Sequence, residues 1–320
     1  MNEDKKSTVY FKILKGHLPT IYPYVFFAIV LMVSSTLSEH FFSSKNLINL
    51  LMQNVVIIIM SVGQLFVTTG GEIDLSVGSI AALSACLVSR MLIIGFYPWV
   101  AIIVVAVIAA SIGLLNGSLI YYGRSPSFMI TLSMMSLIYG IAYSYQSGLD
   151  FRISNSAFLS IYKKQIAGIP WLIIYLFLFI LFIRFIFRRT VYGRAIVAIG
   201  ENRQVSADAG IKIGYYILST YLISGILAGF GGILTAAKLG SGTALIGRGA
   251  EIDSVAAVLI GGGSLKGGRG SVTRTVVGAL ILGISGNVLN LLAVGTSWQL
   301  IFKGLVILIA MFPNGNKISF

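Results

Sequence analysis

Ten runs of mostly apolar residues alternate with short polar stretches along the chain. A helix needs about 20 apolar residues to cross the hydrocarbon core of a bilayer, and fewer where it is broken or buried among other helices. Most of the runs approach that length, whereas the eighth is short. The pattern therefore predicts an all-α polytopic membrane protein with about ten transmembrane helices, at 21–38, 46–70, 75–94, 98–122, 127–145, 170–187, 215–237, 252–263, 272–292 and 297–312.

Composition supports a membrane protein. Of the 320 residues, 57% are hydrophobic and only 10% are charged, which leaves too little polar surface to cover a soluble globule. The net charge of +13 could suggest nucleic acid binding, but Lys and Arg stand at the ends of apolar runs and form no basic stripe with interleaved aromatic residues. Membrane topology and anionic lipid headgroups explain this charge better, so membrane lipid is an expected partner and nucleic acid is not.

The positions of the basic residues predict an orientation. With the N-terminal segment 1–20 placed in the cytoplasm, most of the 23 Lys and Arg residues fall on the cytoplasmic side, including the cluster at 184–212 and the 264–274 loop. Positive charge near span ends marks the cytoplasmic face, so both termini are predicted to be cytoplasmic. The longest loop on the opposite face, 146–169, is expected to be either a cover that meets a partner or a solvated connector.

The tripeptide Glu-Ile-Asp occurs twice, at 72–74 and at 251–253, and each copy opens an apolar segment rich in Gly, Ala and Ser. The two copies begin the third and eighth predicted spans, and an odd offset makes them enter the membrane from opposite faces. This arrangement is typical of an inverted repeat, here of spans 2–5 and 7–10. Chance is the competing explanation for a match of three residues.

The first copy sits at a predicted helix break. Gly70 and Gly71 permit a tight turn, Asp74 can cap the next helix, and Ser76 and Ser79 can satisfy backbone groups that the break leaves free. A structural cap is the favoured interpretation. The alternative is that the break lines a solute path, where hydroxyl and backbone groups contact a polar ligand.

The longest polar interruption flanked by basic residues is 193–211. Asn202 is a good helix N-cap, residues 203–209 can form two turns, and Gly210 is a good stop where positive φ is expected. Such a short helix needs a docking surface, which is either the inner face of the protein itself or an ATPase subunit.

Small residues recur within two of the spans. Glycines among Ala, Ser and Thr let helices approach closely in lipid, where hydrophobicity provides no net association force. We therefore expect tight helix packing in the seventh and ninth spans, around Gly225, Gly229, Gly231, Gly232, Gly278, Gly283 and Gly286.

The sequence carries no pattern of an enzyme or a metal site. Cys86 is the only cysteine, and His17 and His40 have no neighbouring cluster of ligands, so no metal or cofactor is expected. The glycine-rich stretch 261–270 lacks the order G-x-x-x-x-G-K-[ST] of a phosphate-binding loop, which favours a cytoplasmic hairpin. An ion-coupled secondary transporter or channel for a small polar solute stays open as an alternative, although its acidic residues would be expected deeper within the spans.

Five motifs, in this order, resemble the membrane permease subunit of the ribose-type ATP-binding-cassette (ABC) sugar importers, the ribose, xylose, arabinose and galactose permease family. They lie at 72–79, 125–132, 193–211, 251–270 and 278–283. The resemblance runs from about residue 30 to residue 312. It implies a multi-pass permease of the bacterial plasma (inner) membrane that performs no enzyme chemistry itself.

The resemblance also implies the partners and the site. A single permease domain over 1–320 would pair with a second copy or a close paralogue, with an ABC ATPase subunit at the coupling loop 188–214 and with a substrate-binding protein outside. ATP hydrolysis in the ATPase would drive uptake of a pentose or another small sugar-like solute. The residues that match the coupling loop of the family are Gly193, Arg194, Asn202, Ala209, Gly210 and Ile211. The candidates for the translocation path, which fall on the membrane motifs of the family, are Asp74, Ser76, Gly78 and Asp253.

The chain departs from the family pattern at two places. Many relatives place an acidic residue and two alanines after the loop asparagine, where this chain has Arg203, Gln204 and Val205. That difference changes the expected contacts of the coupling helix and suggests a matched ATPase. Glu72 stands where relatives often have a neutral residue, so the resemblance assigns it no role.

Overall fold

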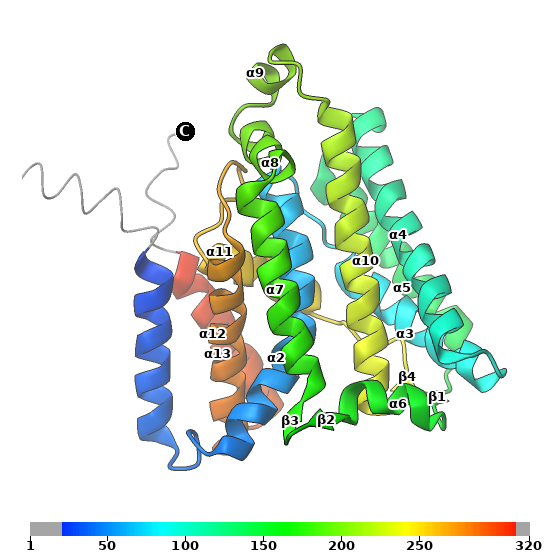
Figure 1. Cartoon of the computed structure of the whole chain (residues 1–320), viewed down its shortest axis with the longest axis vertical. Helices are drawn as coiled ribbons and strands as arrows, with labels where there is room; N and C mark the ends of the chain where they lie inside the picture. The colour runs from blue at the N-terminus through cyan, green and yellow to red at the C-terminus, as the bar shows by residue number, and fades with distance from the viewer. Residues whose placement is uncertain (1–20, 312–320) are drawn as a thin grey trace, which may run out of the picture.

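The computed structural model describes residues 21–311, and its elements are almost all helices that run roughly side by side (Figure 1). The predicted N-terminal segment 1–20 and the residues after 311 lie outside the described part. The helices are a first helix (Ile21–Leu37), α2 (Ser44–Thr69), α3 (Val77–Ile93), α4 (Pro98–Gly123), α5 (Ser127–Gln146), α6 (Ser156–Lys163), α7 (Trp171–Arg189), α8 (Val191–Glu201), α9 (Arg203–Asp208), α10 (Ile213–Leu239), α11 (Ala250–Ile260), α12 (Val272–Leu291) and α13 (Thr296–Met311).

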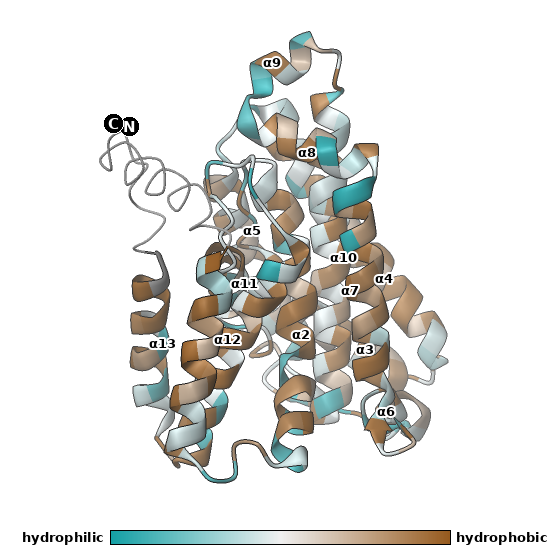
Figure 2. Cartoon of the chain, turned by 60° about the vertical axis from the view of Figure 1, so that its left-hand side comes forward, coloured by the Kyte–Doolittle hydropathy of each residue, from teal (hydrophilic) through white to brown (hydrophobic). Residues whose placement is uncertain are grey.

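Each of the ten apolar runs coincides with a helix, which confirms an all-α membrane protein. Six helices, α2, α4, α5, α7, α10 and α12, are long and apolar enough to cross a membrane. The first helix, α3 and α13 are shorter apolar helices, and α11 has only 11 residues. Hydrophobic residues dominate the helices, and hydrophilic residues gather mainly toward the ends of the bundle (Figure 2). The count of ten spans stays a prediction.

Helix α10 packs against α2, α3 and α4 at once. Its glycines make this possible, because a Cβ atom at Gly225 would lie 2.5 Å from the Ala109 carbonyl oxygen on α4, and one at Gly232 would lie 2.1 Å from the Ala81 carbonyl oxygen on α3. The close packing expected of these small residues is confirmed on α10, whereas a Cβ atom at Gly286 on α12 would meet nothing within 4 Å. Cys86 is fully buried in the same core, where it acts as a small packing residue.

The segment 146–169 is folded and lies at the opposite end of the bundle from α9 (Figure 1). β1 (Phe151–Arg152) pairs antiparallel with β4 (Ser241–Gly242), and β2 (Gln165–Ile166) pairs with β3 (Ile169–Pro170). Between them, α6 buries Phe158 completely, and the Tyr162 hydroxyl donates to the Met52 carbonyl oxygen at 3.0 Å. These contacts tie the segment to α2 and α10, and a partner for it stays a prediction.

Candidate functional site

A buried polar network holds the break between α2 and α3. The Asp74 carboxylate accepts hydrogen bonds from the Ser76 backbone N–H at 2.9 Å, from the Ser76 hydroxyl at 2.6 Å and from the Ser224 hydroxyl on α10 at 2.8 Å. The Asn116 amide on α4 donates to the Ser76 hydroxyl at 2.8 Å, and Asp74 and Ser76 are both fully buried. Asp74 therefore satisfies a backbone N–H at the break, although the N-cap position of α3 is Ser76, which carries no side-chain cap hydrogen bond. The same interactions join the break to α4 and α10.

The second copy of the tripeptide has a different conformation. Residues 72–74 lie in the nonhelical connection before α3, whereas Glu251 and Asp253 lie in the first turn of α11. Asp253 forms an ion pair with Lys303 on α13, and both side chains are partly exposed. Of the four candidates for the translocation path, Asp74, Ser76 and Gly78 are thus packed in the interior, and Asp253 lies on a partly exposed face. A translocation role for these residues stays a prediction.

Residues 193–211 contain two helices where the sequence predicted one. The predicted short helix is α9. The backbone N–H of Val205 donates to the Asn202 side chain at 3.0 Å, as expected of an N-cap. Gly210, after the helix, has a φ of 80°. The additional helix is α8, capped by the Thr190 side chain. Its apolar residues Ala195, Ile196 and Ile199 recur at helical spacing and are buried, a pattern that identifies α8 from the sequence.

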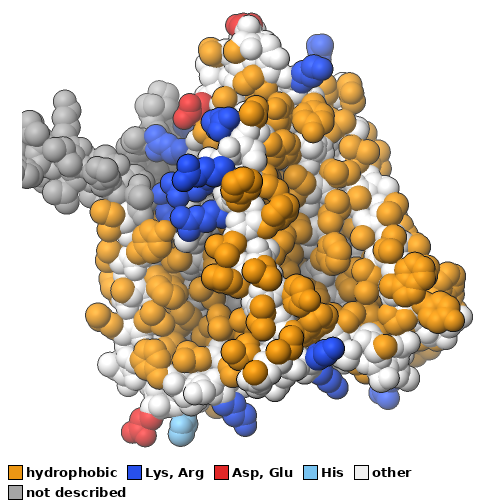
Figure 3. Space-filling model, viewed as in Figure 1, with side chains coloured by type: hydrophobic (Ala, Val, Ile, Leu, Met, Phe, Trp, Pro, Cys, Tyr) orange, Lys and Arg blue, Asp and Glu red, His pale blue; other side chains and the backbone are white. Residues whose placement is uncertain are grey.

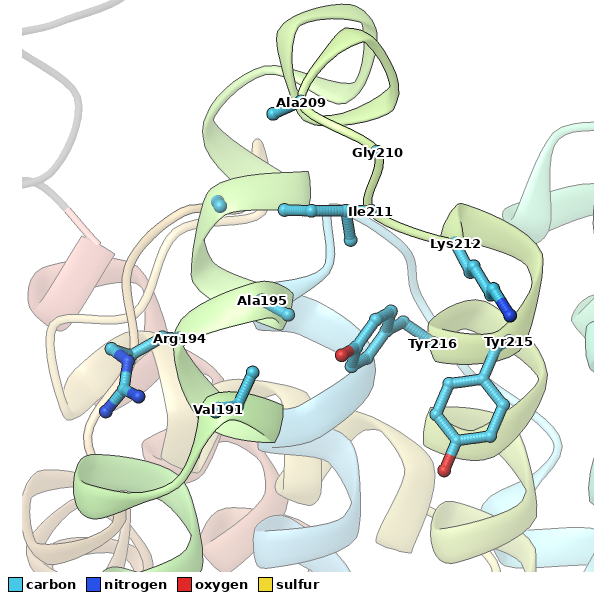
Figure 4. A pocket seen from close by; sticks show the side chains of 10 residues that line it. Val191, Arg194, Ala195, Ala209, Gly210, Ile211, Lys212, Tyr215 and Tyr216 are labelled. Atoms are coloured by element: carbon cyan, nitrogen blue, oxygen red, sulfur yellow. The ribbon is translucent and has the colours of Figure 1, made fainter.

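A hollow of about 640 Å³ lies between α8, α9 and the start of α10 (Figure 4). Arg194, Ala209, Gly210 and Ile211, four of the residues predicted for ATPase coupling, line it, and Asn202 caps α9 beside it. Lys212, Tyr215 and Tyr216 also line it and were not predicted for coupling. Gly193 does not line the hollow and packs instead against the end of α7, where a Cβ atom on it would lie 2.0 Å from the Phe187 carbonyl oxygen.

Tyr192 anchors α8 to its neighbours. Its ring lies 6.2 Å from that of Phe66 on α2 and 5.5 Å from that of Tyr216 on α10. Its hydroxyl lies 2.7 Å from that of Ser219, and burial raises the pKa of Tyr192 to about 12. The hydroxyl therefore stays protonated at neutral pH and remains available for this hydrogen bond.

Three glycines bring α8 against two helix breaks, which are the α2–α3 connection and the 261–271 loop between α11 and α12. A Cβ atom at Gly267, in the 261–271 loop, would lie 2.7 Å from Cα of Gly200 on α8 and 2.8 Å from Cα of Gly71 after α2. The Gly268 N–H donates to the Thr69 carbonyl oxygen at 2.9 Å. The predicted hairpin at 261–270 is thus a loop between α11 and α12 that contacts the ends of α2 and α8. We call this contact of Gly71, Gly200 and Gly267 the glycine junction.

A family model described as the permease component of branched-chain amino acid transport systems matches residues 46–311. The chain belongs to this permease family. The ribose import permease protein RbsC of Escherichia coli K12 is 34% identical over 293 residues, 90% of this chain and 91% of that protein. RbsC of Bacillus subtilis is 35% identical over 304 residues, 94% of each. The D-allose transport system permease protein AlsC of Escherichia coli K12 is 32% identical over 286 residues, 89% of this chain and 88% of that protein.

These relatives confirm the resemblance to the ABC sugar permeases. No solved structure matches the chain significantly. The permease is a multi-pass protein of the bacterial inner membrane and a transport subunit, and the ATPase of such systems is a separate subunit.

The two departures from the family pattern contact each other in this permease. Arg203, the first residue of α9, forms an ion pair with Glu72 beside the α2 end of the break. Glu72 is largely buried while Arg203 is half exposed, so the ion pair is only partly shielded from water. It borders a cavity of about 770 Å³ that Tyr121, Tyr122 and Arg124 also line. Glu72 therefore acquires a structural role that the sequence did not indicate.

Reversing one charge of this ion pair should weaken the permease, and reversing both should restore it. Arg203→Glu places two carboxylates together, and we expect ATP-driven uptake to fall about three-fold, the scale of one partly exposed ion pair. Glu72→Arg combined with Arg203→Glu should recover most of the loss. Uptake by the two single variants and the double variant, measured at low and high salt, tests this. Equal losses in all three variants would contradict a direct interaction.

Basic side chains gather near the α8 end of α7, above a largely hydrophobic face (Figure 3). Arg184, Arg188, Arg189 and Arg194 are exposed there. Within residues 21–311 the structure brings together no group of three or more His, Cys, Asp or Glu side chains that could hold a metal ion.

Proposed function

We propose that the permease is the membrane subunit of an ATP-driven importer for a pentose or another small sugar-like solute, which a substrate-binding protein delivers from outside. The relatives support a sugar, since they are described as permeases for ribose, for D-allose and for L-arabinose. One structural observation carries the proposal. The projecting α8–α9 segment has its base packed, through the glycine junction, against both helix breaks.

This contact suggests how ATP hydrolysis would move the permease. A displacement of α9 by the ATPase is passed to the α2–α3 connection through the Glu72–Arg203 ion pair, and to the 261–271 loop through Gly200. Both connections adjoin short helices, α3 and α11. Helix breaks of this kind absorb backbone movement more easily than continuous helices, because their backbone is not held by a regular ladder of hydrogen bonds.

The proposed topology has one domain over 1–320 with ten spans, and with an inverted repeat of α2–α5 and α10–α13. The termini and the coupling loop 188–214 face the cytoplasm, the 146–169 segment faces outside, and a second copy or paralogue completes the importer. Support comes from the exposed arginines near α8 and from the position of α6 at the other end of the bundle. The specific ATPase and binding protein remain to be identified by co-purification.

Uptake in sealed proteoliposomes tests the function. The permease is reconstituted with its ATPase and binding protein, and radiolabelled D-ribose, D-allose and L-arabinose are offered with and without ATP. We expect uptake of at least one sugar, only with ATP and only with the ATPase. Uptake that persists without the ATPase, or that follows a proton or sodium gradient and ignores ATP, would establish the ion-coupled alternative instead.

Val205 is expected to contact the ATPase directly. It is an apolar side chain that is 61% exposed on α9, the outermost helix at its end of the bundle (Figure 1). Val205→Asp should reduce ATPase binding about five-fold to ten-fold, because a carboxylate would be desolvated in the contact. Binding of the purified ATPase to the permease in nanodiscs measures this. Gln204→Ala is the matched control on the same helix, and an equal loss in both variants would contradict a specific contact.

A further inference from the structure

The first turn of α11 lies about halfway across the bundle. α11 ends at Ile260, beside the 261–271 loop that contacts the end of α2. Its 11 residues span about 16 Å, or about half of a hydrocarbon core about 30 Å thick. Lys303, near the midpoint of the 16-residue α13, lies at the same level because it pairs with Asp253. Charged side chains therefore occupy the middle of the bundle.

Five polar or charged residues from three helices and one connection form this mid-bundle cluster. Asp253 pairs with Lys303, and the Arg248 guanidinium lies 5.5 Å from the centroid of the Tyr143 ring on α5. The Glu251 carboxylate and the Tyr139 hydroxyl, also on α5, both lie beside Gly78. We define the mid-bundle cluster as Tyr139, Arg248, Glu251, Asp253 and Lys303.

Two atoms of the cluster lack hydrogen-bond partners among the described residues. They are Oε2 of Glu251 and the hydroxyl oxygen of Tyr139, and both are almost inaccessible to solvent. Each lies over Gly78 at the start of α3, where a Cβ atom would be 2.1 Å from Glu251 Oε2 and 3.1 Å from the Tyr139 hydroxyl. The Gly247 carbonyl oxygen would lie 2.5 Å from the same Cβ atom, so the missing side chain at Gly78 lets the connection before α11 and both polar side chains approach the start of α3. An unpaired carboxylate oxygen and an unpaired hydroxyl are costly in a protein interior unless a ligand or water completes them.

The partial exposure of the charged side chains indicates which environment this face of the permease contacts. The side chains of Lys303 and Asp253 are 36% and 20% exposed, and Arg248 is exposed as well. Charged groups at this depth are strongly disfavoured against lipid and face either water or protein. A carboxylate is an acceptor with several lone pairs, and neutral polyhydroxylated solutes offer many hydroxyl donors. The balanced charges of the cluster suit a neutral polar solute better than an ion.

Building on the proposed function, we infer that the mid-bundle cluster borders the aqueous path and hydrogen-bonds the hydroxyl groups of a neutral sugar in transit. Glu251 and Asp253 accept from solute hydroxyls, and Tyr139 donates to or accepts from them. Lys303 and Arg248 balance the two carboxylates, so the solute binds without a cation. Only Asp253 of these five residues was a candidate on sequence grounds.

Thiol accessibility tests the path without requiring the ATPase or a known solute. In a Cys86→Ser background, Ile252→Cys reports on the cluster, since Ile252 is 58% exposed on α11 beside Asp253. Phe182→Cys is the matched control, because Phe182 is 61% exposed on α7, about 10 Å from the α8 end of that helix. A charged, membrane-impermeant methanethiosulfonate is applied to the full-length permease in membrane vesicles opened to both sides.

We expect Ile252→Cys to react at least about ten-fold faster than Phe182→Cys, because the attacking thiolate forms only in contact with water. Equally slow reaction at both positions would overturn the inference. Slow reaction combined with ready cross-linking of Ile252→Cys between two copies would also overturn it, and would show that the cluster is covered by a second permease.

A second measurement separates solute binding from coupling. Glu251→Gln and Tyr139→Phe are assayed with whichever of D-ribose, D-allose and L-arabinose the unmodified permease takes up. We expect uptake to fall about ten-fold while ATP hydrolysis stimulated by the loaded binding protein stays within about two-fold. Unchanged uptake, or loss of hydrolysis together with uptake, would overturn the assignment. Absence of ATPase-dependent uptake by the unmodified permease would refute the proposed function and leave the thiol result intact.

Discussion

The ATP-driven uptake of a Gly200→Val permease is expected to fall by more than about ten-fold. Overpacking a tight contact costs about 1–3 kcal/mol, and ~1.4 kcal/mol corresponds to a ten-fold change in an equilibrium constant. A Cβ atom at Gly200 would lie 1.9 Å from the Thr69 carbonyl oxygen and 2.3 Å from the Gly268 nitrogen. Both are backbone atoms that cannot rotate away. The added side chain would therefore push α8 off the end of α2 and off the 261–271 loop.

Uptake, the amount of permease in the membrane and ATPase stimulation should all be measured for Gly200→Val. We expect the variant to bind the ATPase through α9 and yet fail to link hydrolysis to uptake. Gly140→Ala on α5 is the matched control, since a Cβ atom there meets nothing within 4 Å, and it should behave like the unmodified permease. Normal uptake by Gly200→Val would show that the glycine junction does not transmit movement.

Asp74→Ala is expected to destabilise the folded permease by several kcal/mol. The substitution removes the acceptor of three hydrogen bonds, from the Ser76 N–H, the Ser76 hydroxyl and the Ser224 hydroxyl. Each donor left unsatisfied in a buried site costs about 1–3 kcal/mol. The loss would loosen the α2–α3 break where it is joined to α10.

The temperature at which half of the detergent-solubilised permease aggregates measures this effect. We expect a marked decrease for Asp74→Ala and a smaller one for Asp74→Asn, which keeps one carbonyl oxygen as an acceptor. Asp208→Ala serves as the control on α9, where Asp208 accepts only one exposed hydrogen bond from Gln204. An unchanged aggregation temperature in Asp74→Ala would contradict the structural role of the network.

Several features of the site were predictable from the sequence because they depend on neighbouring residues. The Asn202 cap and the positive φ of Gly210 are confirmed, and Asp74 satisfies the Ser76 N–H at the break, since each involves residues within a few positions of one another. Helix α8 was missed, although its buried apolar residues follow a helical spacing. The intervening polar residues made the segment look like a loop.

Other features could not be predicted, since they join residues far apart in the chain. Glu72 and Arg203 each looked like an isolated departure from the family pattern, and only the fold places them in one ion pair. Lys303 was an unexplained charge within a predicted span. A single Lys side chain within a membrane span needs an oppositely charged partner, but the sequence alone did not identify Asp253 as that partner.

The sequence by itself determined the helical membrane class, the positions of ten helical segments and the family, because apolar run length and local motifs depend on residues close together in the chain. Only the tertiary structure decided that α8 rests on both helix breaks, that Glu72 pairs with Arg203, and that a charged cluster lies at mid-bundle depth. Such contacts arise from the packing of segments far apart in the chain, such as Gly71 and Gly267, which are separated by 196 positions. Hydrophobic pattern sets which residues enter the membrane, whereas close packing sets which of them meet.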